Sequence, residues 1–183
     1  MTHRIPVRLV FVFLGFYICS SAYADDAAHT WLMKINQAAR NLEYEGVFVY
    51  QHDTQLEAMR IFHKVEKNIS KERLVSLNGA PREIIRDEHE VRCYWPDKNS
   101  VMVEYRQSDN KGFPAILPER LQDLDEYYVL KLGNTERITG RAAQLVVIKP
   151  ADQYRYGYHL WADKETGLLL KADLLDTQGN ILE

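Results

Sequence analysis

Two residues of the chain, His89 and Cys93, have side chains and a spacing that could contribute to a metal site. They lie four positions apart in a segment that alternates like a strand, so both side chains point to one face. Structural zinc sites use four such ligands, and the sequence has no CxxC or HxH motif to supply the others. We therefore expect neither a metal site nor a bound cofactor.

The common catalytic signatures are missing from the sequence, which has no GxSxG, HExxH, Walker or GxGxxG motif. A hydrolase that uses Cys93 with a histidine is one interpretation. A cysteine on a strand face is more often a small apolar residue of the core, however. The acidic residues between Glu83 and Glu90 lie among arginines, which favours a solvated surface of mixed charge over paired catalytic carboxylates. We therefore predict that the protein is not an enzyme.

Residues 1–24 have the three parts of a secretory signal peptide. Two arginines precede an unbroken apolar run, Leu9–Ile18, and a small-x-small pattern follows at residues 22–24. The apolar run is too short for a membrane anchor, which needs ~20 residues. Cys19 follows an isoleucine, where a lipoprotein signal needs a small residue. We expect cleavage before Asp25 and export to the periplasm.

Cleavage also changes the charge and the cysteine content of the chain. It removes two arginines and no acidic residue, so the formal net charge goes from −3 to −5. This balance argues against nucleic acid as a partner, because nucleic-acid binding needs a basic face. Cys19 is lost, and Cys93 alone cannot form an internal disulfide. Residues 25–183 must therefore fold as one domain on hydrophobic burial.

One amphipathic helix precedes a series of strands. Asp26–Leu42 places apolar residues at helical spacing. Beyond Gly46 the chain alternates in short segments separated by turns such as Asn78-Gly79, and we count about ten strands without a βαβ crossover. The predicted fold class is α+β, mainly antiparallel β: a curved, unclosed β-barrel with the N-terminal helix packed at its concave face.

The last hairpin is the most apolar part of the sequence. We predict that Asp163 pairs with Gly167 around a three-residue loop in which Gly167 has a positive φ. This register pairs Leu160 with Leu170 and makes one face wholly apolar and the other mixed. One interpretation is that the apolar face is ordinary core beneath the helix.

The other interpretation is a ligand cavity. A single helix is narrow beside strands of ~17–20 Å, so a wide sheet must curl or leave part of its concave face uncovered. An apolar cavity on that face would suit acyl chains. The predicted lining residues are Phe48, Tyr50, Met59, Ile61, Tyr156, Tyr158 and Leu160.

Three segments form a pattern in the same order as in a known family: Glu72–Arg86, Cys93–Asp97 (CYWPD) and Arg155–Asp176. Together they resemble the RseB/MucB family of periplasmic regulators of the envelope-stress sigma factor, sigma-E. The resemblance implies a LolA/LolB-like barrel that binds the periplasmic part of a membrane-spanning anti-sigma factor (RseA/MucA-like) and protects it from proteolysis. It also implies that lipid signals, such as mislocalised lipopolysaccharide, relieve this protection.

The family carries a second, smaller C-terminal domain, and we expect that domain to be absent because the sequence stops at Glu183. Two functions remain open. The first is a negative regulator of the sigma-E response, whose partners are an anti-sigma factor and a lipid signal. The second is a periplasmic lipoprotein carrier or acyl-chain-binding protein. The sequence does not predict the oligomeric state.

Overall fold

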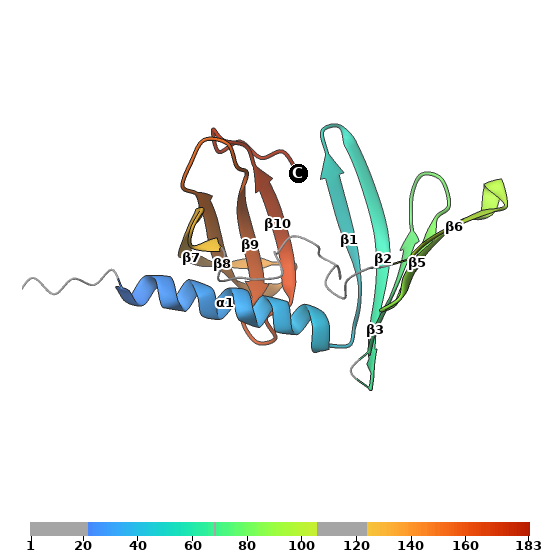
Figure 1. Ribbon diagram of the computed structural model, residues 1–183, viewed down its shortest axis with the longest axis horizontal. Helices are drawn as coiled ribbons and strands as arrows, with labels where there is room; N and C mark the ends of the chain where they lie inside the picture. The colour runs from blue at the N-terminus through green and yellow to red at the C-terminus, as the bar shows by residue number, and fades with distance from the viewer. Residues whose placement is uncertain (1–21, 68, 106–123) are drawn as a thin grey trace, which may run out of the picture.

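The computed structural model describes residues 22–67, 69–105 and 124–183 (Figure 1). Within these ranges one α-helix precedes ten strands, which confirms the predicted order of elements. Nearly all of the predicted signal peptide lies outside the described residues. The elements are α1 (Ala22–Asn41), β1 (Tyr44–His52), β2 (Gln55–Glu66), β3 (Ile69–Ser76), β4 (Glu83–Arg86), β5 (Glu90–Trp95), the 3₁₀ turn η1 (Pro96–Lys98), β6 (Ser100–Tyr105), β7 (Tyr128–Ile138), β8 (Arg141–Pro150), β9 (Gly157–Asp163) and β10 (Leu169–Leu175).

The strands form two antiparallel sheets. The large sheet has six strands in the order β1 to β6, and the small sheet has four in the order β10-β9-β8-β7. α1 lies against the small sheet, where it contacts β7, β8 and β10 (Figure 1). The predicted unclosed, mainly antiparallel architecture with an N-terminal helix is therefore confirmed. The strands are nevertheless divided between two sheets, and the helix packs on one of them.

The helix core is the main apolar cluster and joins α1 to the inner face of the small sheet. Ala28, Leu32 and Ile35 follow helical spacing, which places them on one side of α1, and all three are buried. The buried residues of the helix core are Ala28, Leu32, Ile35, Leu124, Leu130, Val146, Ile148, Leu160 and Ala162. A fully buried leucine contributes roughly 1.5–3 kcal/mol, so the burial of Leu32 and Ile35 in this cluster stabilises the packing of α1 on the small sheet.

The turn between β9 and β10 holds the middle of α1 in place. Lys34 Nζ donates a hydrogen bond of 2.6 Å to the carbonyl oxygen of Lys164 in this turn. Gly167 has a φ of +80°, as predicted, and a Cβ added to it would lie 2.6 Å from Lys34 Cγ. The close approach of turn and helix therefore requires glycine at this position.

The register of the β9–β10 hairpin differs from the prediction. Leu160 pairs with Ala172 and not with Leu170. The turn is wider than expected because Asp163 Oδ1 accepts hydrogen bonds from the amides of Glu165 and Thr166, and a register shift follows between Leu169 and Lys171. The two changes together move the register by two residues. Because side chains alternate between the two faces, a shift of two leaves Leu160 on the predicted apolar face.

Candidate functional site

The inner face of the large sheet carries a second, smaller apolar cluster, the large-sheet cluster. Phe48 of β1 lies opposite Met59 of β2, and Ile61 of β2 lies opposite Leu74 of β3. Alternation along each strand places these side chains on the same face. The cluster consists of the buried Met59, Ile61 and Leu74, with the partly buried Tyr44, Phe48 and Ile84 packed against them.

The structure divides the seven predicted lining residues between the two sheets. Phe48, Met59 and Ile61 come together in the large-sheet cluster. In contrast, Leu160 is fully buried in the helix core, and Tyr158 packs against that core. The remaining two, Tyr50 and Tyr156, are exposed. The first three residues thus share one surface, and their role in binding an acyl chain stays a prediction.

A row of polar side chains crosses the same face at one end of the large-sheet cluster. Tyr44, His63, Glu72 and Arg86 are cross-strand neighbours on β1, β2, β3 and β4. The ring of Tyr44 stacks on His63 with centroids 4.8 Å apart, and Arg86 Nη1 donates a hydrogen bond of 2.8 Å to Glu72 Oε2. His63 and Glu72 are both buried. Sequence reasoning missed this row, because it becomes visible only when the strand register is known.

The polar row also connects the large sheet to the helix. His63 Nδ1 lies 2.7 Å from the carbonyl oxygen of Leu42, the residue after α1, so this nitrogen is the donor. Burial, and then the negative charge of Glu72, raise the pKa of the Tyr44 hydroxyl. The phenol therefore keeps its proton to a higher pH than an exposed tyrosine does.

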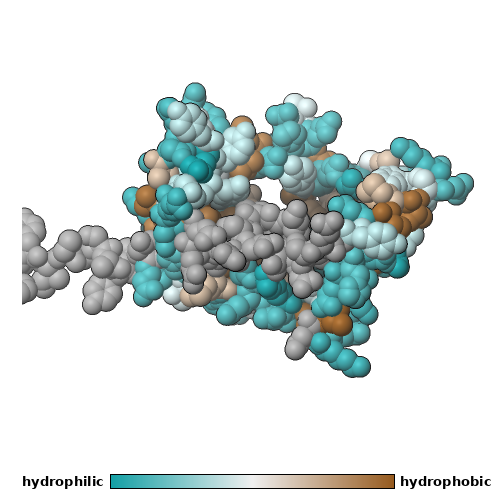
Figure 2. Space-filling view, in the orientation of Figure 1, coloured by the Kyte–Doolittle hydropathy of each residue, from teal (hydrophilic) through white to brown (hydrophobic). Residues whose placement is uncertain are grey.

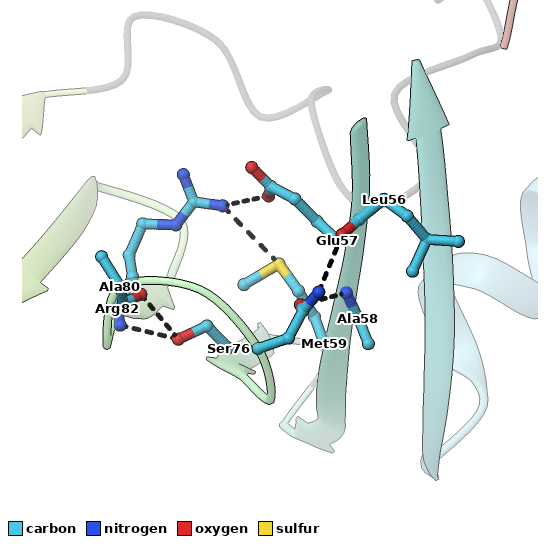
Figure 3. Close-up of polar contacts among 8 residues, drawn as sticks. Leu56, Glu57, Ala58, Met59, Ser76, Ala80 and Arg82 are labelled. Atoms are coloured by element: carbon cyan, nitrogen blue, oxygen red, sulfur yellow. Dashed lines mark hydrogen bonds and ion pairs between the residues drawn. The ribbon is translucent and has the colours of Figure 1, made fainter. Parts of the chain in front are cut away.

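Arg82 borders the opposite end of the large-sheet cluster (Figure 3). Its Nη2 lies 2.7 Å from Glu57 Oε2 and 3.9 Å from Met59 Sδ. The backbone amide of Arg82 donates to Ser76 Oγ at 2.8 Å, which holds the β3–β4 loop against the sheet. This loop contains the predicted Asn78-Gly79 turn, and Asn78 also bonds the β2 backbone. The apolar cluster thus has charged groups at both ends, which suits an amphipathic ligand.

The C-terminal residues lie between the two sheets (Figure 1). The amide of Leu182 donates to the carbonyl oxygen of Leu174 in β10 at 2.8 Å. The side chain of Glu183 then reaches β1, where its Oε1 lies 3.1 Å from His52 Nδ1. Although Tyr50 is exposed, some loss of hydration and a hydrogen bond to Glu183 raise the pKa of its hydroxyl. These contacts connect the small sheet to the first strand of the large sheet.

His89 and Cys93, the residues first considered for metal and thiol chemistry, lie just before and within β5. Within residues 22–67, 69–105 and 124–183, no group of three or more His, Cys, Asp and Glu side chains could hold a metal ion. Cys93 is buried, and burial raises the pKa of its thiol, which disfavours the reactive thiolate. In the same ranges, no helix is both long enough and apolar enough to cross a membrane.

The amino-acid sequence is similar to that of a known protein family. The profile of the MucB/RseB N-terminal domain matches residues 27–183. The sigma factor AlgU regulatory protein MucB of Pseudomonas aeruginosa is 32% identical over 160 residues, which cover 85% of this chain and 48% of the relative. The sigma-E factor regulatory protein RseB of Haemophilus influenzae is 32% identical over 184 aligned positions, which cover 98% of this chain and 57% of the relative.

Solved structures agree with the sequence comparisons. A crystal structure of MucB matches with a TM-score of 0.70 at 30% identity, over 86% of this chain and 55% of that protein. MucB in the Pseudomonas aeruginosa MucA/MucB complex matches with a TM-score of 0.67, also at 30% identity, over 85% of this chain and 53% of that one. The chain spans about half the length of the curated relatives it matches. Through this N-terminal domain, the chain belongs to the MucB/RseB family.

Proposed function

We propose that this chain is a periplasmic negative regulator of the sigma-E envelope-stress response. It binds the periplasmic part of a membrane anti-sigma factor and protects that factor from proteolysis. The observation that carries the proposal is the likeness to MucB, which was crystallised in complex with periplasmic MucA. The predicted signal peptide supports export to the compartment where such a partner is located.

The proposal includes relief of the protection by a lipid. The large-sheet cluster and the charged groups at its two ends, Arg82 and Arg86, match an amphipathic ligand such as lipopolysaccharide or the acyl chains of a lipoprotein. A ligand that binds the partner-free state more tightly than the bound state shifts the population towards release. The lipid therefore acts by differential affinity and needs no contact with the anti-sigma factor.

A protection assay tests the first part of the proposal. The periplasmic segment of the anti-sigma factor is incubated with a protease that cleaves it, with and without a molar excess of the chain. We expect the chain to retain the segment in a pull-down and to slow its cleavage. Added lipopolysaccharide should restore the cleavage rate. Failure to retain the segment, with or without lipid, would reject the regulator.

Two adjacent residues provide a matched test of the lipid site. Phe48 belongs to the large-sheet cluster, whereas Val49 points to the other face of β1 and is exposed. We expect Phe48→Ser to weaken the response to lipid and Val49→Ser to leave it unchanged. If both variants respond like the wild type, the lipid binds elsewhere. Rescue of a carrier-deficient strain, with lipoprotein that co-purifies, would instead favour the alternative carrier function.

A further inference from the structure

The loop between β8 and β9, residues 151–156, presents two tyrosine side chains to water. Tyr154 is 83% exposed and Tyr156 is 52% exposed. The loop lies at the end of the small sheet opposite the β9–β10 turn, where Figure 2 shows side chains of intermediate hydropathy, in pale tones, at the surface (Figures 1 and 2). In contrast, Tyr44 and Tyr158 are partly buried and pack against the two apolar clusters. Packing of the fold therefore does not explain the two exposed rings.

The charged side chains of this loop hold its own backbone. Asp152 accepts a hydrogen bond of 2.9 Å from the amide of Tyr154 and forms an ion pair with Arg155. The Cζ atom of Arg155 lies 4.1 Å from the ring centroid of Tyr127, just before β7. The amide of Ala151 donates a hydrogen bond of 2.8 Å to the carbonyl oxygen of Tyr127. The loop is thus tied both to itself and to the start of the neighbouring strand.

The two ends of the loop are packed against each other. Gly157, the first residue of β9, is buried, and a Cβ added to it would lie 3.3 Å from Cδ of Pro150, the last residue of β8. This close approach joins the end of one strand to the start of the next. A loop that is ordered in advance loses less conformational entropy on binding, so it binds more tightly than a flexible loop with the same side chains.

The composition of the loop favours a polypeptide as its partner. Tyrosine and arginine dominate the binding energy of many protein–protein interfaces, and a tyrosine ring offers a large contact area at a low entropy cost. Asp152 and Arg155 are the charged residues of the loop, so residues 151–156 carry no net charge. An anionic membrane surface attracts basic segments, which this loop is not.

We propose that the β8–β9 loop is a docking surface for the periplasmic polypeptide of the anti-sigma factor, with Tyr154 and Tyr156 as its main contacts. The inference rests on the proposed function, in which this polypeptide is the partner. The likeness to MucB, which was crystallised with periplasmic MucA, favours this occupant. The rings pack against apolar side chains of the segment, and the hydroxyl groups bond to its backbone.

Binding of the periplasmic segment to variants of the whole chain tests this surface. We expect the double variant Tyr154→Ala, Tyr156→Ala to bind the segment at least about tenfold more weakly than the wild type. Tyr154→Phe keeps the ring and should retain most of the affinity. The matched control is Tyr105→Ala, since Tyr105 is 78% exposed but lies on β6, remote from the small sheet (Figure 1). Titration calorimetry measures the Kd, and circular dichroism checks that each variant is folded.

Chemical labelling tests the same surface in the wild type, without any substitution. Mild iodination modifies exposed tyrosine rings, and mass spectrometry reports the extent at each position. Tyr154 and Tyr105 have similar exposed fractions, 83% and 78%, so both should be labelled in the free chain. We expect the bound segment to slow the labelling of Tyr154 several-fold and to leave that of Tyr105 unchanged.

The outcomes separate this inference from the proposed function. If the wild type and the double variant bind the segment equally, and Tyr154 is not protected, the docking surface is elsewhere and the proposed function stands. If the wild type binds no segment, both fail. Equal weakening by Tyr105→Ala would show that the loss is not specific to the loop and would also overturn the inference. Loss of binding only to phosphatidylethanolamine–phosphatidylglycerol vesicles in the double variant would assign the loop to a membrane contact instead.

Discussion

The small sheet and the large sheet bury their apolar side chains to different extents. The inner face of the small sheet is covered by α1, and the helix core includes Leu32, Ile35 and Leu160 at 1% exposure or less. The large sheet has more strands, yet its apolar cluster contains three buried residues, Met59, Ile61 and Leu74. Several of its other apolar side chains, such as Val47, Val49 and Val101, are exposed. The comparison indicates that α1 and the small sheet form the larger core, and that the large sheet contributes less buried apolar surface to the fold.

The largest expected effect is the loss of a side chain from the helix core. Leu32→Ala removes a fully buried side chain between α1 and the small sheet, and we expect a loss of about 2–5 kcal/mol in the free energy of unfolding. Met33→Ala, at the next and exposed position, should change it by less than about 0.5 kcal/mol. Urea unfolding followed by circular dichroism measures both. Equal effects would show that α1 is not held by the small sheet.

The next effect concerns the turn that touches the helix. Gly167→Ala adds a Cβ that meets Lys34 and forces alanine into a positive φ, so we expect a loss of about 1–3 kcal/mol in unfolding free energy. Gly79 in the large sheet has a φ of +69° and open space around it. Gly79→Ala should therefore cost only the backbone strain, about 1–2 kcal/mol. If Gly167→Ala lost no more unfolding free energy than Gly79→Ala, this result would contradict the close contact between turn and helix.

The stability of the small sheet should depend on pH through Asp163. Burial alone would raise the pKa of this carboxyl, but hydrogen bonds from Thr166, Arg141 and Glu165 outweigh it, and the pKa is lowered. Because the pKa is lower in the folded state, ionised Asp163 stabilises the fold at pH values above its unfolded pKa of about 3.9. This contribution to the free energy of unfolding is lost as the pH falls through the folded pKa.

Asp163→Asn tests this linkage. We expect the variant to be less stable than the wild type at pH 7, and the difference in unfolding free energy to shrink as the pH falls from about 5 towards 2. Arg141→Gln removes one of the bonds to Asp163 and should reduce the pH dependence in part. A difference that stays constant with pH would mean that Asp163 does not carry this contribution.

The sequence predicted local features of this structure well. The helical spacing of Ile35 and its neighbours and the positive φ of Gly167 both depend on nearby residues, and both are confirmed. The register of the last hairpin was wrong, because the side-chain hydrogen bonds of Asp163 and the bulge after Leu169 leave no mark in the alternation of apolar residues. The prediction of a hairpin register therefore requires the geometry of the turn as well as the pattern of apolar residues.

The lining of the candidate site depends on which strands lie side by side. The alternation of apolar residues within one strand does not contain this information. Alternation correctly placed Phe48, Met59 and Ile61 on one face, since β1 and β2 are adjacent in the chain. Tyr158 and Leu160 were assigned to the same lining, but their hairpin belongs to the second sheet and lies in or against the core beneath α1. Which sheet a hairpin joins is decided by packing between segments far apart in sequence. The row through His63 and Glu72 was missed for the same reason.

The smallest expected effect distinguishes the outer faces of the two sheets. Arg73 Nε lies 2.6 Å from Glu83 Oε1 on the outer face of the large sheet, where Arg73 is exposed and Glu83 is partly exposed. Water and salt screen such a pair, so we expect Arg73→Gln to leave the midpoint of urea unfolding unchanged at 1 M salt and nearly so at low salt. Arg141→Gln should shift the midpoint at either salt concentration, because its partner Asp163 is buried. If Arg73→Gln were the more damaging change, the stability of the large sheet would depend on its surface ion pairs more than that of the small sheet does on Asp163.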